Sequence, residues 1–255
     1  MPAIRSIFLQ QLRFLLADPG PLLTWLLAPL LMMAILKEAE ELFLVQQGFK
    51  GANGAEQVIP GMAVMFSFFW ARSIGHMFMS EHRWGTWERL AMSFANPVQV
   101  VLGKLLPIVL VIAVNHLVLI GLGTLIFDLN ATGAVLGLVP LFAALNLCVV
   151  MLGFAFVAIF RTSAQIDIVG TMLTLLFAML GGALVPSFSL PALAEDLAPF
   201  TPSYWVMDGS RAVILEGEGI SAVLGPTAAV LGFAAAFAVV AMTRFRFADA
   251  KAVGA

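Results

Sequence analysis

The sequence contains little charge and few of the side chains that carry out chemistry. Of its 255 residues 11% are charged, three are histidine, one is cysteine and one is tyrosine. The single cysteine, Cys148, excludes a disulfide within the chain and the cysteine pairs of zinc and redox motifs. Three scattered histidines predict no metal site. A net charge of −2 gives no electrostatic basis for binding nucleic acid, which requires clustered cations.

The motifs of several common enzyme classes are also missing. The phosphate loop G-x-x-x-x-G-K-[ST] does not occur, since the sole Gly-Lys pair, Gly103-Lys104, is followed by leucine and lacks the upstream glycine. The zinc motif H-E-x-x-H is absent, and the G-x-S-like fragments have no matching base. We therefore expect no catalytic residues, no cofactor bound directly and no ATP hydrolysis by this chain alone.

Apolar residues dominate the composition. They make up 61% of the chain, and the mean hydropathy is +1.01, which is typical of an integral membrane protein. A helix that crosses about 30 Å of hydrocarbon needs roughly 20 apolar residues. Six stretches have about that length: residues 20–36, 58–80, 105–127, 133–160, 168–186 and 220–243. We predict an all-α integral membrane protein with six transmembrane helices, in which residues 1–255 form one domain.

The distribution of basic residues predicts the orientation. An even number of spans places both termini on one side, and basic residues favour the cytoplasmic side. If the termini are cytoplasmic, nine of the thirteen basic residues lie inside, three lie outside and Arg72 lies within a span. We therefore predict a multi-pass protein of the plasma membrane with both termini in the cytoplasm.

An amphipathic segment precedes the first span. In residues 1–18, apolar side chains recur at helical spacing while Arg5 and Arg13 occupy other faces. This pattern predicts a helix that lies in the inner membrane interface and ends at Asp18-Pro19-Gly20. The alternative is a straight extension of the first span, which Pro19 disfavours.

Charges and two tryptophans follow the second span. In residues 81–96, Trp84, Trp87 and Leu90 fall at helical spacing with charged residues around them. This spacing predicts a short amphipathic cytoplasmic helix parallel to the membrane. By its pattern alone, such a helix is equally consistent with an interfacial anchor and with a docking surface for a soluble partner.

Arg72 is the one charge well inside a predicted span. An unpaired charge there costs several kcal/mol, so its side chain should face the bundle or a cavity. Arg72 either contacts an anionic part of a cargo, and so lines a translocation path, or pairs with a backbone carbonyl or an acid such as Asp167. His76 lies one helical turn further on, where it either joins such a lining or packs near the interface.

The predicted outer segment, residues 187–219, is about twice the usual length of a loop. Its two halves are moderately apolar and too short to span. This pattern is consistent with two structures. One is a pair of half-helices that dip into the outer leaflet, and the other is a solvated loop with surface helices.

Taken in order, these elements resemble the permease subunit of type-2 ABC exporters, in particular the drug and antibiotic-resistance branch. The resemblance covers nearly the whole chain. It includes the amphipathic helix, the six spans, Pro60-Gly61, Asn96-Pro97, residues 199–211 and an E-x-x-x-G-T-x-E-x-L element. That element consists of Glu81, Gly85, Thr86, Glu88 and Leu90.

The resemblance implies a complex with other chains. A cytoplasmic ABC ATPase in two copies, with ATP and Mg²⁺ bound to it, would grip the coupling helix after the second span, and a second permease chain, identical or related, would complete the pore. The cargo would be a hydrophobic or amphipathic small molecule moved out of the cell. The coupling residues implied are Glu81, Trp84, Gly85, Thr86, Trp87, Glu88, Arg89 and Leu90.

Two other functions fit the same architecture. One is export of a lipid-linked glycan or lipid, although a single tyrosine argues mildly against the stacking of sugars. The other is a membrane anchor that docks a soluble partner without transporting anything.

Overall fold

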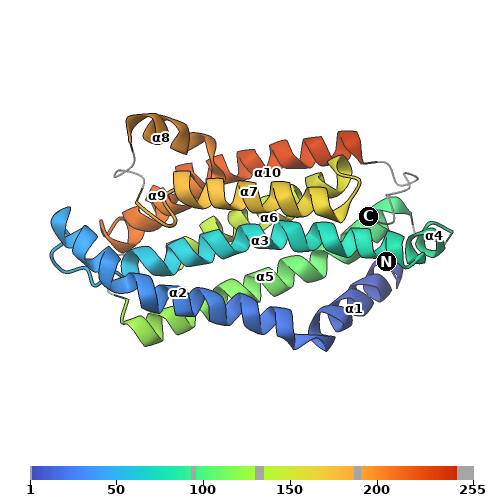
Figure 1. The fold of residues 1–255 in the computed structure, drawn as a ribbon, viewed down its shortest axis with the longest axis horizontal. Coiled ribbons are helices and arrows are strands. Elements are labelled where there is room, and N and C mark those ends of the chain that lie inside the picture. Colours follow the sequence, from blue (N-terminus) through green and yellow to red (C-terminus); the bar gives the residue numbers. More distant parts are fainter. Residues whose placement is uncertain (1, 93–95, 130–134, 187–190, 246–255) are drawn as a thin grey trace.

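The protein is a bundle of α-helices. The computed structural model describes residues 2–92, 96–129, 135–186 and 191–245, and these ranges contain helices and no strands, which confirms the predicted all-α class. The helices are α1 (Pro2–Ala17), α2 (Pro19–Gln46), α3 (Ala55–Arg83), α4 (Thr86–Ala91), α5 (Pro97–Phe127), α6 (Leu138–Ile159), α7 (Ser163–Leu180), α8 (Ala192–Leu197), α9 (Pro202–Ile214) and α10 (Leu224–Arg244) (Figure 1).

Six of the described helices are long and apolar enough to cross a membrane: α2, α3, α5, α6, α7 and α10. The chain is thus a multi-pass membrane protein. Three helices, α2, α3 and α5, are longer than the predicted spans, and α2 and α5 differ most. α2 continues past residue 36 to Gln46 because its charged residues do not by themselves stop a helix and no glycine occurs between residue 36 and Gly48. α5 begins at Pro97 instead of residue 105, because Asn96 and Gln99 form a capping box there.

A break separates α1 from α2. The Asp18 side chain caps α2 by accepting a hydrogen bond from the Gly20 amide at 3.1 Å, and Pro19 occupies the first helical turn. α1 runs at an angle to α2 and packs against α5 (Figure 1). The break lies where the sequence predicts one, while the placement of α1 in the membrane interface remains a prediction.

α3 forms the centre of the bundle. It packs against α2, α5, α6, α7 and α9, and its large side chains Phe68, Ile74 and Phe78 are fully buried. Close backbone approaches surround it. A Cβ atom on Gly61 would lie 2.2 Å from the carbonyl oxygen of Ala183, and one on Gly153 of α6 would lie 2.8 Å from that of Ala71. Glycine is therefore required where these backbones meet.

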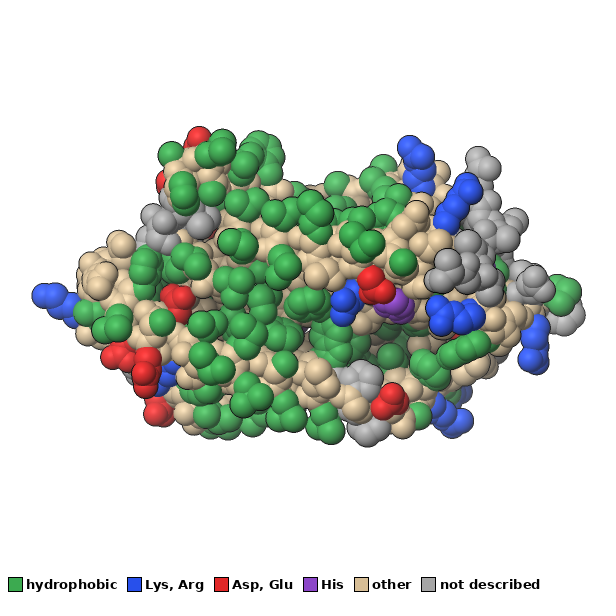
Figure 2. Space-filling view, in the orientation of Figure 1, with side chains coloured by type: hydrophobic (Ala, Val, Ile, Leu, Met, Phe, Trp, Pro, Cys, Tyr) green, Lys and Arg blue, Asp and Glu red, His purple; other side chains and the backbone are tan. Residues whose placement is uncertain are grey.

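The two ends of the bundle differ in charge. One end, which we call the α4 end, holds α1, α4 and the last turn of α10, and most Lys and Arg side chains of the visible face gather there (Figures 1 and 2). The opposite end, the α8 end, carries most of the acidic side chains of that face (Figure 2). Between the ends the surface is largely apolar, as expected of a lipid-facing bundle.

The segment before α10 has two different halves. α8 has no buried residue, whereas α9 packs against α3, α6, α7 and α10. The Ser203 hydroxyl of α9 donates to the Phe177 carbonyl at 2.5 Å, and Val206 and Val213 are fully buried. α8 is thus a surface helix and α9 is packed into the bundle, while insertion of this segment into the outer leaflet stays a prediction; residues 187–190 lie outside the described ranges.

The packing around Gly61 predicts the effect of adding one methyl group there. Gly61→Ala should lower the free energy of unfolding by about 1–3 kcal/mol, because the new Cβ meets the backbone oxygen of Ala183. Gly232→Ala in α10 is the control: nothing lies within 4 Å of its Cβ, so loss of a helix-interior glycine should stabilise by at most about 1 kcal/mol. Thermal unfolding in detergent measures both, and equal midpoints would contradict this packing.

Candidate functional site

The predicted coupling helix is divided by a turn. Glu81 and Arg83 belong to the last turn of α3, Trp84 and Gly85 form the turn, and α4 begins at Thr86. Gly85 has a φ of +65°, a left-handed conformation that glycine adopts without a steric penalty. The prediction of one continuous amphipathic helix through Trp84 and Trp87 is therefore wrong, because apolar spacing does not reveal a positive φ.

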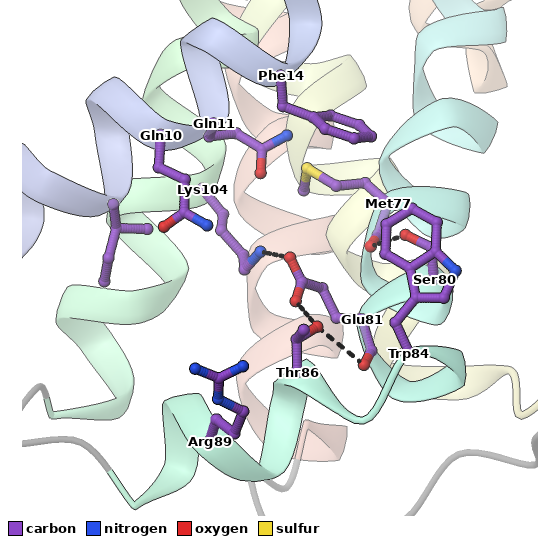
Figure 3. Close-up of a pocket in the computed structure, with 11 residues that line it drawn as sticks. Gln10, Gln11, Phe14, Met77, Ser80, Glu81, Trp84, Thr86, Arg89 and Lys104 are labelled. Carbon is purple, nitrogen blue, oxygen red and sulfur yellow. Dashed lines mark hydrogen bonds and ion pairs between the residues drawn. The ribbon is translucent and has the colours of Figure 1, made fainter.

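Glu81 joins three helices (Figure 3). One of its carboxylate oxygens accepts a hydrogen bond from the ammonium group of Lys104 on α5, and the other accepts one from the hydroxyl group of Thr86 on α4. The side chain of Lys104 is 3% exposed and that of Glu81 is 19% exposed. A buried ammonium needs such a partner, because removing one member of a buried pair leaves an uncompensated charge. The contacts of Glu81 with Lys104 and Thr86 thus hold the end of α3 to the starts of α4 and α5.

Trp87 attaches α4 to the bundle a second time. Its side chain is 6% exposed, its ring stacks on His82 with centroids 4.7 Å apart, and the ring of Phe78 lies 5.9 Å away. The rings of Trp87 and Phe245 meet edge to face at 6.4 Å, just after α10 ends. α4 is therefore held by burial of a large aromatic side chain as well as by the Glu81 network.

Other residues of this element point outward. Trp84 is 61% exposed and meets Phe14 of α1 edge to face at 6.3 Å, and Arg89 is exposed on α4. The two tryptophans thus occupy opposite environments instead of one shared face. The backbones of Glu88 and Leu90 lie in α4, but their side chains lie outside what the structure describes.

A cavity of about 550 Å³ opens between α1, α3, α4 and α5. Figure 3 shows its labelled lining, in which Gln11 and Phe14 of α1 face Lys104, Glu81 and Trp84. The Gln11 side chain was not singled out by the sequence, because a lone glutamine on an amphipathic helix carries no motif. Its importance depends on the packing of α1 on α5.

A second polar group lies on the surface shared by α3 and α7. Arg72 Nε and Asp167 Oδ1 are 3.5 Å apart, and Arg72 Nη1 donates to the Thr171 hydroxyl at 3.1 Å. His76 Nε2 lies 2.7 Å from the same Asp167 oxygen. We call these four residues the α3–α7 polar cluster. Of the alternatives for Arg72, the pairing with Asp167 is present, and His76 shares the same carboxylate oxygen.

The α3–α7 polar cluster is only partly covered. The Arg72, His76 and Asp167 side chains are 33%, 41% and 44% exposed. Figure 2 shows basic, acidic and histidine side chains side by side amid the apolar side chains of this face. Exposure of such a group to hydrocarbon is costly, so this surface suits contact with another chain or with a hydrated space.

Comparison with known proteins identifies the architecture. A family model described as ABC-2 family transporter protein matches residues 24–243. The linearmycin resistance permease protein LnrN of Bacillus subtilis is 25% identical over 192 residues, which cover 74% of this chain and 49% of that protein. The inner membrane transport permease YhhJ of Escherichia coli is 25% identical over 177 residues, covering 68% of this chain and 46% of that protein. The chain thus spans about half the length of these curated relatives.

The Glu81 network predicts a non-additive effect on stability. Glu81→Gln should lower the free energy of unfolding by about 3 kcal/mol, because it leaves the buried Lys104 ammonium without its carboxylate. The double variant Glu81→Gln/Lys104→Met should be less destabilised than Glu81→Gln alone, because it also removes the charge. The exposed Glu38 supplies the control, since Glu38→Gln should change stability by at most about 0.5 kcal/mol. Additive effects in a double-mutant cycle would contradict the network.

Proposed function

Because the chain belongs to the ABC-2 transporter family, whose model matches residues 24–243, we propose that it is the permease subunit of an ATP-driven exporter. A separate cytoplasmic ABC ATPase, present in two copies, binds ATP and Mg²⁺ and supplies the energy. The cargo is a hydrophobic or amphipathic small molecule that leaves the cell. The observation that carries this proposal is the way in which α4 is joined to the bundle while its outer surface stays exposed.

The ATPase docks on the exposed side of α4. Arg89 and Trp84 offer a charge and an aromatic ring there, while Trp87 and the Glu81 network hold the opposite side to α3 and α5. A push on α4 is therefore transmitted to two spanning helices. The ATPase can shift the permease between states only through contacts that differ between them, and a rigidly attached α4 supplies those contacts.

A second permease chain, identical or related, covers the α3–α7 polar cluster. A charged side chain at the centre of a bilayer costs about 2.5–3.5 kcal/mol, so leaving Arg72 and Asp167 partly exposed to lipid is unfavourable even when they pair. Two chains that face each other through α3 and α7 would enclose the cluster in a common, hydrated path. Arg72 and His76 would then line the route of the cargo.

The similar proteins support the class of cargo. LnrN is named for linearmycin resistance and YhhJ for inner membrane transport, and this chain shares 25% of its aligned residues with each. The 21 phenylalanines and 13 methionines of the sequence supply apolar, adaptable surfaces on which a hydrophobic molecule can bind. We propose a drug-like hydrophobic or amphipathic cargo on this basis.

The protein lies in the plasma membrane with its α4 end in the cytoplasm. The basic side chains that gather at this end support the orientation, since basic residues favour the cytoplasmic side (Figure 2). This orientation brings α4 to the compartment that contains ATP. It also places α8 outside the cell.

Reversing the charge of α4 tests the proposed docking surface. Arg89→Glu should lower efflux and cargo-stimulated ATP hydrolysis by about tenfold or more, because a charge-assisted contact contributes about 1.5–3 kcal/mol. The ATPase and permease are copurified and assayed in proteoliposomes. Lys50→Glu at the α8 end serves as the matched control and should behave like the unmodified protein. If Arg89→Glu weakens docking of a soluble partner but no cargo moves in either protein, the chain is an anchor and the export proposal fails.

Cysteine labelling tests the orientation. The sole cysteine, Cys148, is buried, so Cys148→Ala gives a background for single exposed cysteines. In sealed cells, an impermeant thiol reagent should label Leu193→Cys on α8 and leave Trp84→Cys unlabelled until the membrane is opened, since these side chains are 74% and 61% exposed. Labelling of Trp84→Cys from outside would reverse the proposed topology.

A further inference from the structure

The cavity beside α4 has an excess of hydrogen-bond donors. Both carboxylate oxygens of Glu81 are engaged, by Lys104 and by Thr86. The hydroxyl of Ser80 donates to the Met77 carbonyl at 2.8 Å. No acceptor among the described residues reaches the buried Nε2 of Gln11, although this residue is only 6% exposed. A buried donor without an acceptor is costly, so the cavity suits a ligand that supplies acceptors.

The charge of the cavity selects an anion. Lys104 and Arg89 contribute two positive charges and Glu81 one negative charge, which leaves a net charge of +1 on the lining. Because Glu81 already compensates Lys104, the surplus charge resides on Arg89, whose guanidinium presents several donors in a fork that matches a phosphate. Gln10 and Gln11 add neutral amide donors from α1.

The remainder of the lining is apolar. Ile7, Phe14, Met77 and Trp84 contribute to it, and the edge-to-face pair of Phe14 and Trp84 is exposed to the surroundings. Figure 3 shows that the rings of this pair stand beside Met77, away from Arg89. One side of the cavity therefore suits a charged group and the other suits hydrocarbon, and tryptophan favours the depth of a membrane at which the two meet.

We infer that this cavity binds an anionic phospholipid, with the phosphate at Arg89, an ester carbonyl of the lipid at the Gln11 amide, and the acyl chains along Phe14 and Trp84. The bound lipid lies in the leaflet on the α4 side, which is the inner leaflet in the proposed orientation. It joins α1 to α4 and is distinct from the exported cargo. A free phosphate shares the headgroup chemistry but leaves the apolar lining uncovered.

The test measures lipid binding to the purified full-length chain and requires neither ATPase nor transport. Native mass spectrometry in nonionic detergent gives the dissociation constant of phosphatidylglycerol for each variant. Arg89→Gln should weaken binding about tenfold through loss of a charged donor, and Gln11→Leu should weaken it several-fold. Arg83→Gln is the matched control, because Arg83 is an exposed cation of the same end but not part of the cavity lining. It should bind within about twofold of the unmodified protein.

Gln11→Leu also distinguishes a loss of lipid binding from a loss of folding. Its thermal midpoint without lipid should stay the same or rise, since the change removes a buried donor that lacks an acceptor. Should that variant fail to fold, Arg89→Gln retains the test, because Arg89 lies on the surface. Gln11 is buried and is not available to a docked ATPase, so failure of lipid binding and failure of the export proposal are observed separately.

Three outcomes would overturn the inference. Unchanged affinity in Arg89→Gln and Gln11→Leu would show that the lipid binds elsewhere. An equal loss in Arg83→Gln would indicate attraction by the general charge of this end. Displacement of phosphatidylglycerol by millimolar inorganic phosphate or glycerol phosphate would assign the cavity to a free phosphate instead of a lipid. The inference predicts that neither soluble competitor displaces the lipid.

Discussion

The attachment of α4 depends on the pairing of a buried ammonium group with one carboxylate. Lys104 is 3% exposed near the start of α5, and its partner Glu81 comes from the last turn of α3. Because a charge buried without a partner is strongly unfavourable, the two helix ends must stay in register. Thr86 at the start of α4 binds the second oxygen of the same carboxylate, so the register of α3 and α5 also fixes the start of α4.

This constraint explains how a six-residue helix can be attached firmly enough for the proposed coupling. A helix of that length is marginal by itself, since the nucleation of helices is costly. Here the Glu81 network and buried Trp87 hold the first turn of α4, while Trp84 and Arg89 remain accessible. The proposed lipid fills the one side on which α4 meets α1 across a cavity. Docking and lipid binding would thus meet at Arg89 and Trp84, while coupling uses the opposite side of the element, which Glu81 and Trp87 hold to the bundle.

The sequence predicts the spanning helices well because hydrocarbon requires long apolar runs, which are visible without tertiary information. Helix ends are less predictable. The end of α2 at Gln46 depends on where the chain turns after a charged stretch. The start of α5 is marked by a local signal, the cap at Asn96 and Pro97, but a search for apolar runs alone does not detect it. Apolar spacing placed Trp84 and Trp87 on one face, but the φ of +65° at Gly85 separates them.

Pairings between residues far apart in the sequence could be identified only from the three-dimensional structure. Asp167 was one alternative partner for Arg72, because both residues lie toward the same end of their spans, and the structure has this pair. Glu81 and Lys104 are 23 residues apart, and nothing in their local sequence indicates that the end of α3 meets the start of α5. The buried Gln11 likewise acquires its significance only when α1 packs against α5.

Distance measurements between spin labels test most directly whether α4 moves as one body with α3 and α5. Labels on α4 and on the exposed Leu102 of α5 report motion within one chain, and labels on the two copies of α4 in the assembled transporter report motion between chains. On binding of ATP, the account predicts an unchanged distance within each chain and a changed distance between the chains. A change between α4 and α5 within one chain, with no change between the two chains, would contradict it.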